Sequence, residues 1–304
     1  MDIYLPIAAV TENVFVLFGL GLGVGVVSGL FGVGGGFLLT PFLIFIGVPQ
    51  AVAVASTANQ LVGASLTGVI GYWRRGSVDF QMAAVLSGGG LVGSIVGVAV
   101  FAVLRRFGQI ELVISLGYVI LLGTLGSMML FESVGTLIRA ETPGPRRRLH
   151  NQSWTRRLPW KIRFRRSKLY ISVLLPAGIG FAVGILSAVL GVGGGFVLVP
   201  AMIYILGMPS ATVPGTSLAQ NMVVAVSVTI LQSWTQHTVD GVLVLVLLLG
   251  SVVGVRIGAH HGVRLRGEHL RVLLALVILA VGAKLLFDLT APPGSLYSVT
   301  EREI

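Results

Sequence analysis

Two short segments of the chain carry the same kind of polar side chain, neutral amides and hydroxyls, in apolar surroundings. The two sets are Ser56, Thr57, Asn59 and Gln60, and Thr216, Ser217, Gln220 and Asn221. Inside a membrane, such side chains either join helices by hydrogen bonds or line the path of a solute. Because they offer N–H and O–H donors and no acidic group, the solute they would suit is an oxyanion, such as a sulfonate or a carboxylate.

A glycine-rich pentad, GVGGG, precedes each polar set, at residues 32–36 and 191–195. Glycine costs about 1 kcal/mol in a helix interior and readily adopts positive φ, so each pentad predicts a break in a helix at membrane depth. Exposed amides and a new helix N-terminus carry partial positive charge and would attract an anion. The glycines predicted to bind it are Gly34, Gly35, Gly36, Gly193, Gly194 and Gly195.

The alternative for the pentads is that their glycines only allow helices to cross closely. Two copies in register, each followed by Phe and then Pro, favour a paired site built from broken helices. The pentads are not followed by Gly-Lys-Ser/Thr and have no βαβ context, which argues against nucleotide binding.

Residues for metal or enzyme chemistry are scarce. The chain has no cysteine, and the pair His260–His261 has neither a carboxylate nor a third histidine at helical spacing, so no metal site and no cofactor are predicted. The apolar segments carry no Ser/His/Asp arrangement and no paired carboxylates. We therefore expect a protein that is not an enzyme.

The composition is that of an integral membrane protein. Of 304 residues, 55% are hydrophobic and only 11% are charged, against roughly 25% charged residues in a soluble domain. Apolar runs of about 20 residues, enough to cross a roughly 30 Å hydrocarbon layer as helices, recur along the chain and lack the alternation of barrel strands. The first run follows Met1–Asp2 without a basic leader and is interpreted as a retained helix. We predict an all-α polytopic membrane protein.

The two halves of the chain are copies of each other. Phe37 and Pro41 match Phe196 and Pro200 without a gap, and after one inserted residue GVP matches GMP. Glycines at four-residue spacing follow in both halves and would allow close helix packing; they are Gly89, Gly93 and Gly97, and Gly250, Gly254 and Gly258. Each half divides into five apolar segments of which the second is short: 7–30, 36–47, 50–73, 80–103 and 110–131, then 169–190, 196–206, 210–234, 241–262 and 269–290. This pattern is typical of a duplicated transporter.

The orientation of the two repeats depends on the short segments. If they cross the membrane, the repeats are inverted; if they dip in and return, the repeats are parallel. Much of the net charge of +10 comes from the basic segment between Arg139 and Lys168, which we interpret as a cytoplasmic linker in contact with anionic lipid and not as a nucleic-acid site. With this linker inside, the inverted arrangement leaves only Arg105–Arg106 against the positive-inside rule, so we favour inverted repeats. The predicted parts are a first repeat (1–131), the linker (132–168), a second repeat (169–290) and a C-terminal tail (291–304).

Charged and aromatic residues near the segment ends carry further hypotheses. Arg256 lies well inside the ninth segment and either attracts the anion near the inner mouth or extends to lipid phosphate. Trp73 and Trp234 close their segments and are predicted interface anchors. Lys284 and Asp288 are four residues apart and predict a local ion pair.

The segments SGLFGVGGGFLLTPFLIFIGVPQAVAVAST and SAVLGVGGGFVLVPAMIYILGMPSATVPGTS, together with the duplication, resemble the TauE/SafE sulfite exporter family. The resemblance covers nearly the whole chain outside the linker. It implies a multi-pass transporter, in particular an exporter, of small anions such as sulfite or organosulfonates across the cytoplasmic membrane. The family's usual eight spans agree with ten segments only if each short segment is counted with its neighbour, and the basic linker is a departure that the family does not explain.

The expected partners are a small anionic substrate, bound where the two repeats meet, and membrane lipid, with no nucleic acid; a homodimer is left open. A passive anion channel, a transporter of another small solute and a membrane-embedded enzyme are the alternatives.

Overall fold

The protein is described here by a computed structural model that covers residues 2–139, 160–164, 166–167, 169–236, 239–261 and 267–290. Most of the predicted linker, the predicted tail, Arg264 and Arg266 lie outside the described residues, as do the side chains of His261 and Arg271. The helices are α1 (Val14–Phe31), α2 (Gly36–Phe45), α3 (Gln50–Arg74), α4 (Phe80–Arg106), α5 (Ile110–Arg139), α6 (Leu174–Leu190), α7 (Gly195–Pro200), the π-helix η2 (Ala201–Ile205), α8 (Val213–Gln236), α9 (Gly241–His261) and α10 (Gly267–Thr290). The strands are β1 (Asp2–Leu5), β2 (Val10–Asn13), β3 (Lys161–Phe164) and β4 (Leu169–Ser172).

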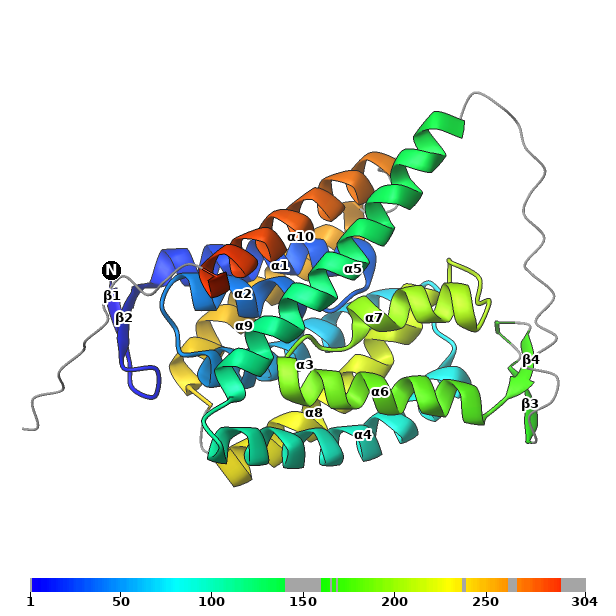
Figure 1. Cartoon of the computed structure of the whole chain (residues 1–304). Coiled ribbons are helices and arrows are strands. Elements are labelled where there is room, and N and C mark those ends of the chain that lie inside the picture. The colour runs from blue at the N-terminus through cyan, green and yellow to red at the C-terminus, as the bar shows by residue number, and fades with distance from the viewer. Residues whose placement is uncertain are drawn as a thin grey trace, which may run out of the picture.

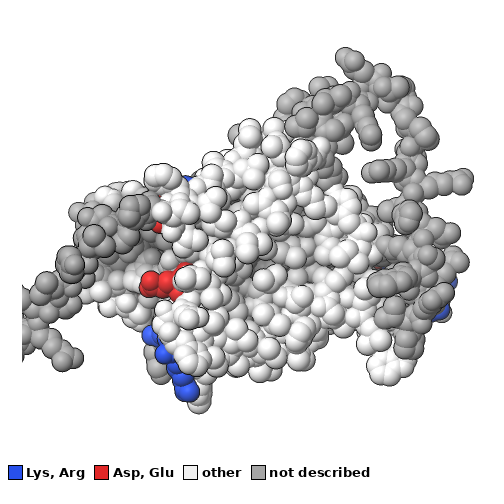
Figure 2. All heavy atoms as spheres, in the orientation of Figure 1, with Lys and Arg blue, Asp and Glu red and all other residues white. Residues whose placement is uncertain are grey.

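The prediction of a helical, multi-pass membrane protein is confirmed. Among the described residues, five helices are long and apolar enough to cross a membrane: α1, α4, α5, α8 and α9. In the view of Figure 2, the charged atoms gather near the two ends of the molecule, and an uncharged band lies between them. Such a band is the surface that hydrocarbon requires.

Each repeat begins with a β-hairpin, which the all-helical prediction missed. β1 pairs antiparallel with β2, and β3 with β4, at opposite ends of the molecule (Figure 1). The segment predicted as helix from residue 7 becomes helical only at Val14, because the Asn13 side chain caps α1 by accepting a hydrogen bond of 3.0 Å from the Phe15 N–H. Strand-forming residues such as Val10 and Thr11 precede this cap. We call the two ends of the molecule the β1–β2 end and the β3–β4 end.

The repeats are inverted. Helices α5 and α10 occupy equivalent places in the two repeats and pack antiparallel: a Cβ at Gly126 would lie 2.9 Å from Ile278, and one at Gly282 would lie 3.3 Å from Leu122. Equivalent helices that run in opposite directions require a two-fold axis in the membrane plane. In each repeat the short helix runs, after the glycine pentad, back toward the end from which the preceding helix started (Figure 1). It is therefore one of five helical elements that alternate in direction, and this odd number gives inverted repeats.

The first helix of each repeat packs along the fourth helix of the other. The glycines of α4 and α9 meet the backbones of α6 and α1: a Cβ at Gly97 would lie 2.9 Å from Ile185, and Cβ atoms at Gly254 and Gly258 would meet the Leu22 and Val26 carbonyls. The predicted close packing is thus confirmed, and it interlocks the two repeats.

Candidate functional site

Both glycine pentads interrupt the helix, as predicted. Six glycines within them have positive φ: Gly32 (69°), Gly34 (89°), Gly35 (71°), Gly191 (68°), Gly193 (73°) and Gly194 (65°). L side chains are strained in this region, so glycine is the residue that allows the chain to turn here. New helices start directly afterwards, α2 at Gly36 and α7 at Gly195.

The two breaks lie against each other at the centre of the protein. The rings of Phe37 and Phe196, which follow the pentads, stack with centroids 4.2 Å apart. A Cβ at Gly36 would lie 2.6 Å from the Gly191 carbonyl, and one at Gly195 would collide with the Val33 carbonyl. The site glycines of the two repeats are therefore brought together.

Asn221 on α8 lies between the two breaks. Its amide nitrogen would be 2.9 Å from a Cβ at Gly34, and its amide oxygen 3.3 Å from a Cβ at Gly194. It is 1% exposed, and neither its amide nitrogen nor its amide oxygen has a hydrogen-bond partner in the protein. A buried amide left unpaired costs about 1–3 kcal/mol, which is the signature of a group that meets a ligand or water.

Other predicted site residues share this property. Gln60 is 1% exposed and has both amide atoms unpaired. The place that Asn221 has between the breaks is taken on α3 by Leu61, whose side chain would collide with a Cβ at Gly193 and lie 3.0 Å from one at Gly36. The hydroxyls of Ser56 and Thr57 are also buried and unpaired. Ser217, the equivalent of Thr57, instead donates a hydrogen bond of 3.1 Å to the Gly32 carbonyl and holds the first break in place.

Three members of the predicted polar sets do not face the breaks. The Gln220 amide is buried and unpaired but is directed at α4, where it would lie 3.1 Å from a Cβ at Gly90. The Asn59 amide donates back to the Ala55 carbonyl of its own helix. Thr216 donates to the Thr212 carbonyl and accepts from the Asp79 N–H, so it serves the end of a helix.

Arg256 is also not at the breaks. It is exposed and lines a separate pocket with Arg74 and Arg75. Lys284, predicted to pair with Asp288, instead places its ammonium group 4.0 Å from the centroid of the Phe45 ring.

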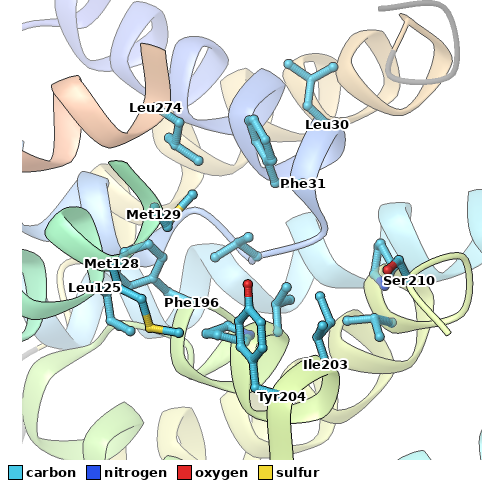
Figure 3. A pocket seen from close by; sticks show the side chains of 15 residues that line it. Leu30, Phe31, Leu125, Met128, Met129, Phe196, Ile203, Tyr204, Ser210 and Leu274 are labelled. Carbon is cyan, nitrogen blue, oxygen red and sulfur yellow. The ribbon is translucent and has the colours of Figure 1, made fainter. Parts of the chain in front are cut away.

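A pocket of about 250 Å³ reaches the breaks from the β3–β4 end. We call it the break pocket. Val33 and Phe196 form its inner wall, and Met128, Leu274 and Tyr204 lie around it (Figure 3). The Tyr204 hydroxyl points into the space between these side chains.

The second repeat widens this pocket through its inserted residue. The insertion relative to the first repeat falls between Pro200 and Gly207, where the structure has the π-helix η2. A π turn is a single-residue insertion in a helix and often marks a functional position. Ile203 and Tyr204 of η2 line the break pocket.

The equivalent place toward the β1–β2 end is crossed by side-chain contacts. The α5–α10 contacts relate Leu122 to Ile278 and Gly126 to Gly282, so Tyr118 is the counterpart of Leu274 and Lys284 of Met128. The three contacts are Tyr118 to the Leu190 carbonyl (2.7 Å, hydroxyl donating), Gln50 to Ser115 (3.0 Å, amide donating) and Lys284 over the Phe45 ring. Gln50 is the counterpart of Ser210, which lines the break pocket. The two mouths thus differ in this structure.

Sequence reasoning missed two kinds of residue. Ser28 and Ser187 are equivalent in the two repeats, buried and unpaired; their place just before the pentads was the available signal. Asp79 and Asp240 are buried and cap α4 and α9, and each carboxylate also holds a hairpin turn of the other repeat: Asp79 accepts from Ser167, and Asp240 from the Ile7 N–H. Only their alignment in the duplication pointed to them.

Comparisons with known proteins agree with this architecture. The sequence pattern of the family described as "Sulfite exporter TauE/SafE" matches residues 17–285. Two similar proteins of Bacillus subtilis are the probable membrane transporter protein YjnA, 29% identical over 88% of this chain and 97% of its own, and the probable membrane transporter protein YunE, 23% identical over 90% and 97%. The sulfite exporter TauE/SafE family protein 1 of Arabidopsis thaliana is 31% identical over 34% of this chain and 23% of its own.

No solved structure matches the chain. The family match nevertheless extends from α1 into α10 and includes both pentads and both polar sets. The chain therefore belongs to the TauE/SafE sulfite exporter family and is a membrane transporter.

Proposed function

We propose that this protein exports a small oxyanion, sulfite or an organosulfonate, across the cytoplasmic membrane. The observation that carries the proposal is the Asn221 amide, buried between two helix breaks with no hydrogen-bond partner. An amide N–H and the N-terminus of α2 offer neutral donors and partial positive charge to an anion without binding it too tightly to leave. Gln60 on α3 supports the proposal because it is a second buried amide without a partner in the protein.

The substrate would reach these amides through the break pocket. Its walls are mostly apolar, and neither Asn221 nor Gln60 lines it. Val33 and Phe196 stand between the pocket and Asn221, so the amides are closed off from both ends in the conformation described. We propose that separation of the two breaks admits the anion, and that the Phe37–Phe196 stack reforms behind it.

Transport by alternating access follows from the inverted repeats. Exchanging the conformations of the two repeats would break the contacts of Tyr118, Gln50 and Lys284 at the β1–β2 end. At the β3–β4 end their counterparts Leu274, Ser210 and Met128 would close together over the break pocket. One pocket would close as the other opens. We further propose that the β3–β4 end, which carries the basic linker, is cytoplasmic.

Reconstitution tests this function. Purified protein in liposomes is given radiolabelled sulfite, sulfoacetate, taurine, thiosulfate or sulfate, and uptake is compared with and without unlabelled anion inside. A transporter that alternates accelerates uptake when the same anion is present on the far side, and we expect this for sulfite or a sulfonate. Uptake without such acceleration would support a passive anion channel, and no uptake of any of the five would reject the proposed substrate class.

A further inference from the structure

A second pocket, of about 270 Å³, lies between the C-terminal ends of α3 and α9 at the β3–β4 end. We call it the arginine pocket. Arg74 and Arg75 contribute from α3, and Arg256 from α9, one turn before His260. The break pocket shares none of these residues, so the function of one does not depend on the other.

The charge of the arginine pocket calls for an anion. All three arginines are exposed, and no Asp or Glu is among the described residues that line it. Three guanidinium groups at one rim repel one another unless an anion lies between them, and a guanidinium binds phosphate oxygens through two parallel hydrogen bonds. Phosphate chemistry therefore fits this rim.

The apolar surroundings show which source of phosphate fits. Ile70 lines the pocket and is 41% exposed; on α9, Val253 and Ile257 are 44% and 42% exposed. Ile70 and Val253 lie about one turn before the arginines on their helices, toward the middle of the molecule, where acyl chains would lie, and Ile257 lies beside Arg256. Trp73, next to Arg74, is 61% exposed, as expected for a ring at the level of the headgroups.

We infer that the arginine pocket binds the phosphate of an anionic phospholipid, with its acyl chains along Ile70, Val253 and Ile257. This assignment gives a role to the single arginine of the otherwise largely apolar α9. It also joins α3 of the first repeat to α9 of the second, which packs along α1 as far as Leu30, so a bound lipid would link the two repeats.

Lipid binding to the detergent-solubilised full chain tests the inference without any measurement of transport. Phosphatidylglycerol, phosphatidylcholine and inorganic phosphate are titrated separately, and retained lipid is detected by native mass spectrometry together with the shift of the melting temperature. We expect retention and a higher melting temperature with phosphatidylglycerol alone. Arg256→Gln is expected to weaken this affinity about fivefold, and Arg74→Gln with Arg75→Gln further, as for loss of about 1 kcal/mol per cation.

Two controls keep the result interpretable. Arg106→Gln removes an exposed arginine from the C-terminus of α4, at the β1–β2 end, and should leave phosphatidylglycerol binding unchanged. Arg256→Lys keeps the positive charge and should retain most of the phosphatidylglycerol binding. Equal binding of phosphatidylglycerol and phosphatidylcholine, or unchanged binding in Arg256→Gln, would overturn the inference. Stabilisation by inorganic phosphate that is lost in Arg256→Gln would identify a soluble-anion site instead.

Discussion

Phe37 and Phe196 stack face to face, with ring centroids 4.2 Å apart and planes 6° from parallel. They are equivalent residues of two inverted repeats, so their contact lies on the axis that relates the halves. Each ring follows a break and lies in the first turn of the short helix. The stack therefore joins the two breaks that the proposed mechanism must separate. Its strength contributes to the free energy of separating them.

A double-mutant cycle measures that contact. Phe37→Leu and Phe196→Leu each keep an apolar side chain and remove one ring, and stacked aromatic pairs contribute about 0.5–1.5 kcal/mol beyond their buried area. We expect the two losses to be non-additive by this amount in unfolding experiments in detergent. Strictly additive losses would mean that the stack itself stabilises nothing.

Alanine at Gly195 should stop transport while alanine at Gly178 should not. A Cβ at Gly195 collides with the Val33 carbonyl and the Asn221 amide, whereas one at Gly178 on α6 has nothing within 4 Å. Overpacking of this kind costs about 1–3 kcal/mol, so we expect Gly195→Ala to lower sulfite flux per folded molecule by about tenfold or more. Gly178→Ala should be neutral or slightly stabilising. Equal flux in both variants would show that the second break does not take part in transport.

The orientation of the repeats is open to thiol labelling, because the chain has no native cysteine. Gln109 lies in the exposed turn between α4 and α5 at the β1–β2 end, and Trp160 is 75% exposed at the β3–β4 end. With the basic linker inside, Gln109→Cys should react with an impermeant reagent on intact cells and Trp160→Cys only after lysis. The reverse labelling pattern would show that the protein has the opposite orientation in the membrane, with the same fold.

Removing the Tyr118 hydroxyl should open the mouth at the β1–β2 end. Tyr118→Phe loses the hydrogen bond to the Leu190 carbonyl, worth about 0.5–1.5 kcal/mol, or roughly two- to tenfold in the population of an open form. A cysteine at Thr40, which is fully buried on α2, should then react faster from that end. A cysteine at Val199, its counterpart in the break pocket, should react more slowly. Unchanged rates at both positions would show that this contact does not hold the mouth closed.

Much of the fold was predictable because it rests on local and repeated signals. Apolar length indicated the helices, the GVGGG copies indicated the breaks, and glycines at four-residue spacing indicated which helix faces pack closely. The hairpins were missed because four-residue strands carry too little pattern beside a strong helical segment, and their anchors, Asp79 and Asp240, act across repeats. Long-range hydrogen bonds of this kind leave no signature in a local stretch of sequence.

The candidate site was predictable in part, and for a physical reason. Glycines act through the backbone, so Gly34 and Gly194 could be placed by type alone. Polar side chains act through direction: Asn221 and Gln220 are neighbours, yet one faces the breaks and the other faces Gly90 on α4. Adjacent residues on a helix point about 100° apart, so a polar run always contains members that serve another interface. The difference between the two mouths involves residues that differ between the repeats, such as Tyr118 against Leu274, but the contacts they make reach other helices and could not be predicted from the local sequence.

A carboxylate at the proposed anion site should abolish transport more completely than loss of the amide. Asn221→Asp keeps the size of the side chain but places a negative charge between the breaks, where repulsion of an oxyanion in a partly dehydrated site costs several kcal/mol, of the order of 4 kcal/mol at 4 Å. Asn221→Ala removes one donor that water can replace in part, at about 1–2 kcal/mol. The same ordering is expected for Gln60→Glu and Gln60→Ala. At Asn59, whose amide donates a hydrogen bond to its own helix, Asn59→Asp should reduce transport less and serves as the matched control.

Flux of sulfite and sulfoacetate is measured in liposomes at equal density of folded protein, so that a loss of stability is not mistaken for a loss of transport. If these amides only join helices, Asn221→Asp and Asn221→Ala will move the anions at the wild-type rate per folded molecule, and the site must then be sought elsewhere along the break pocket.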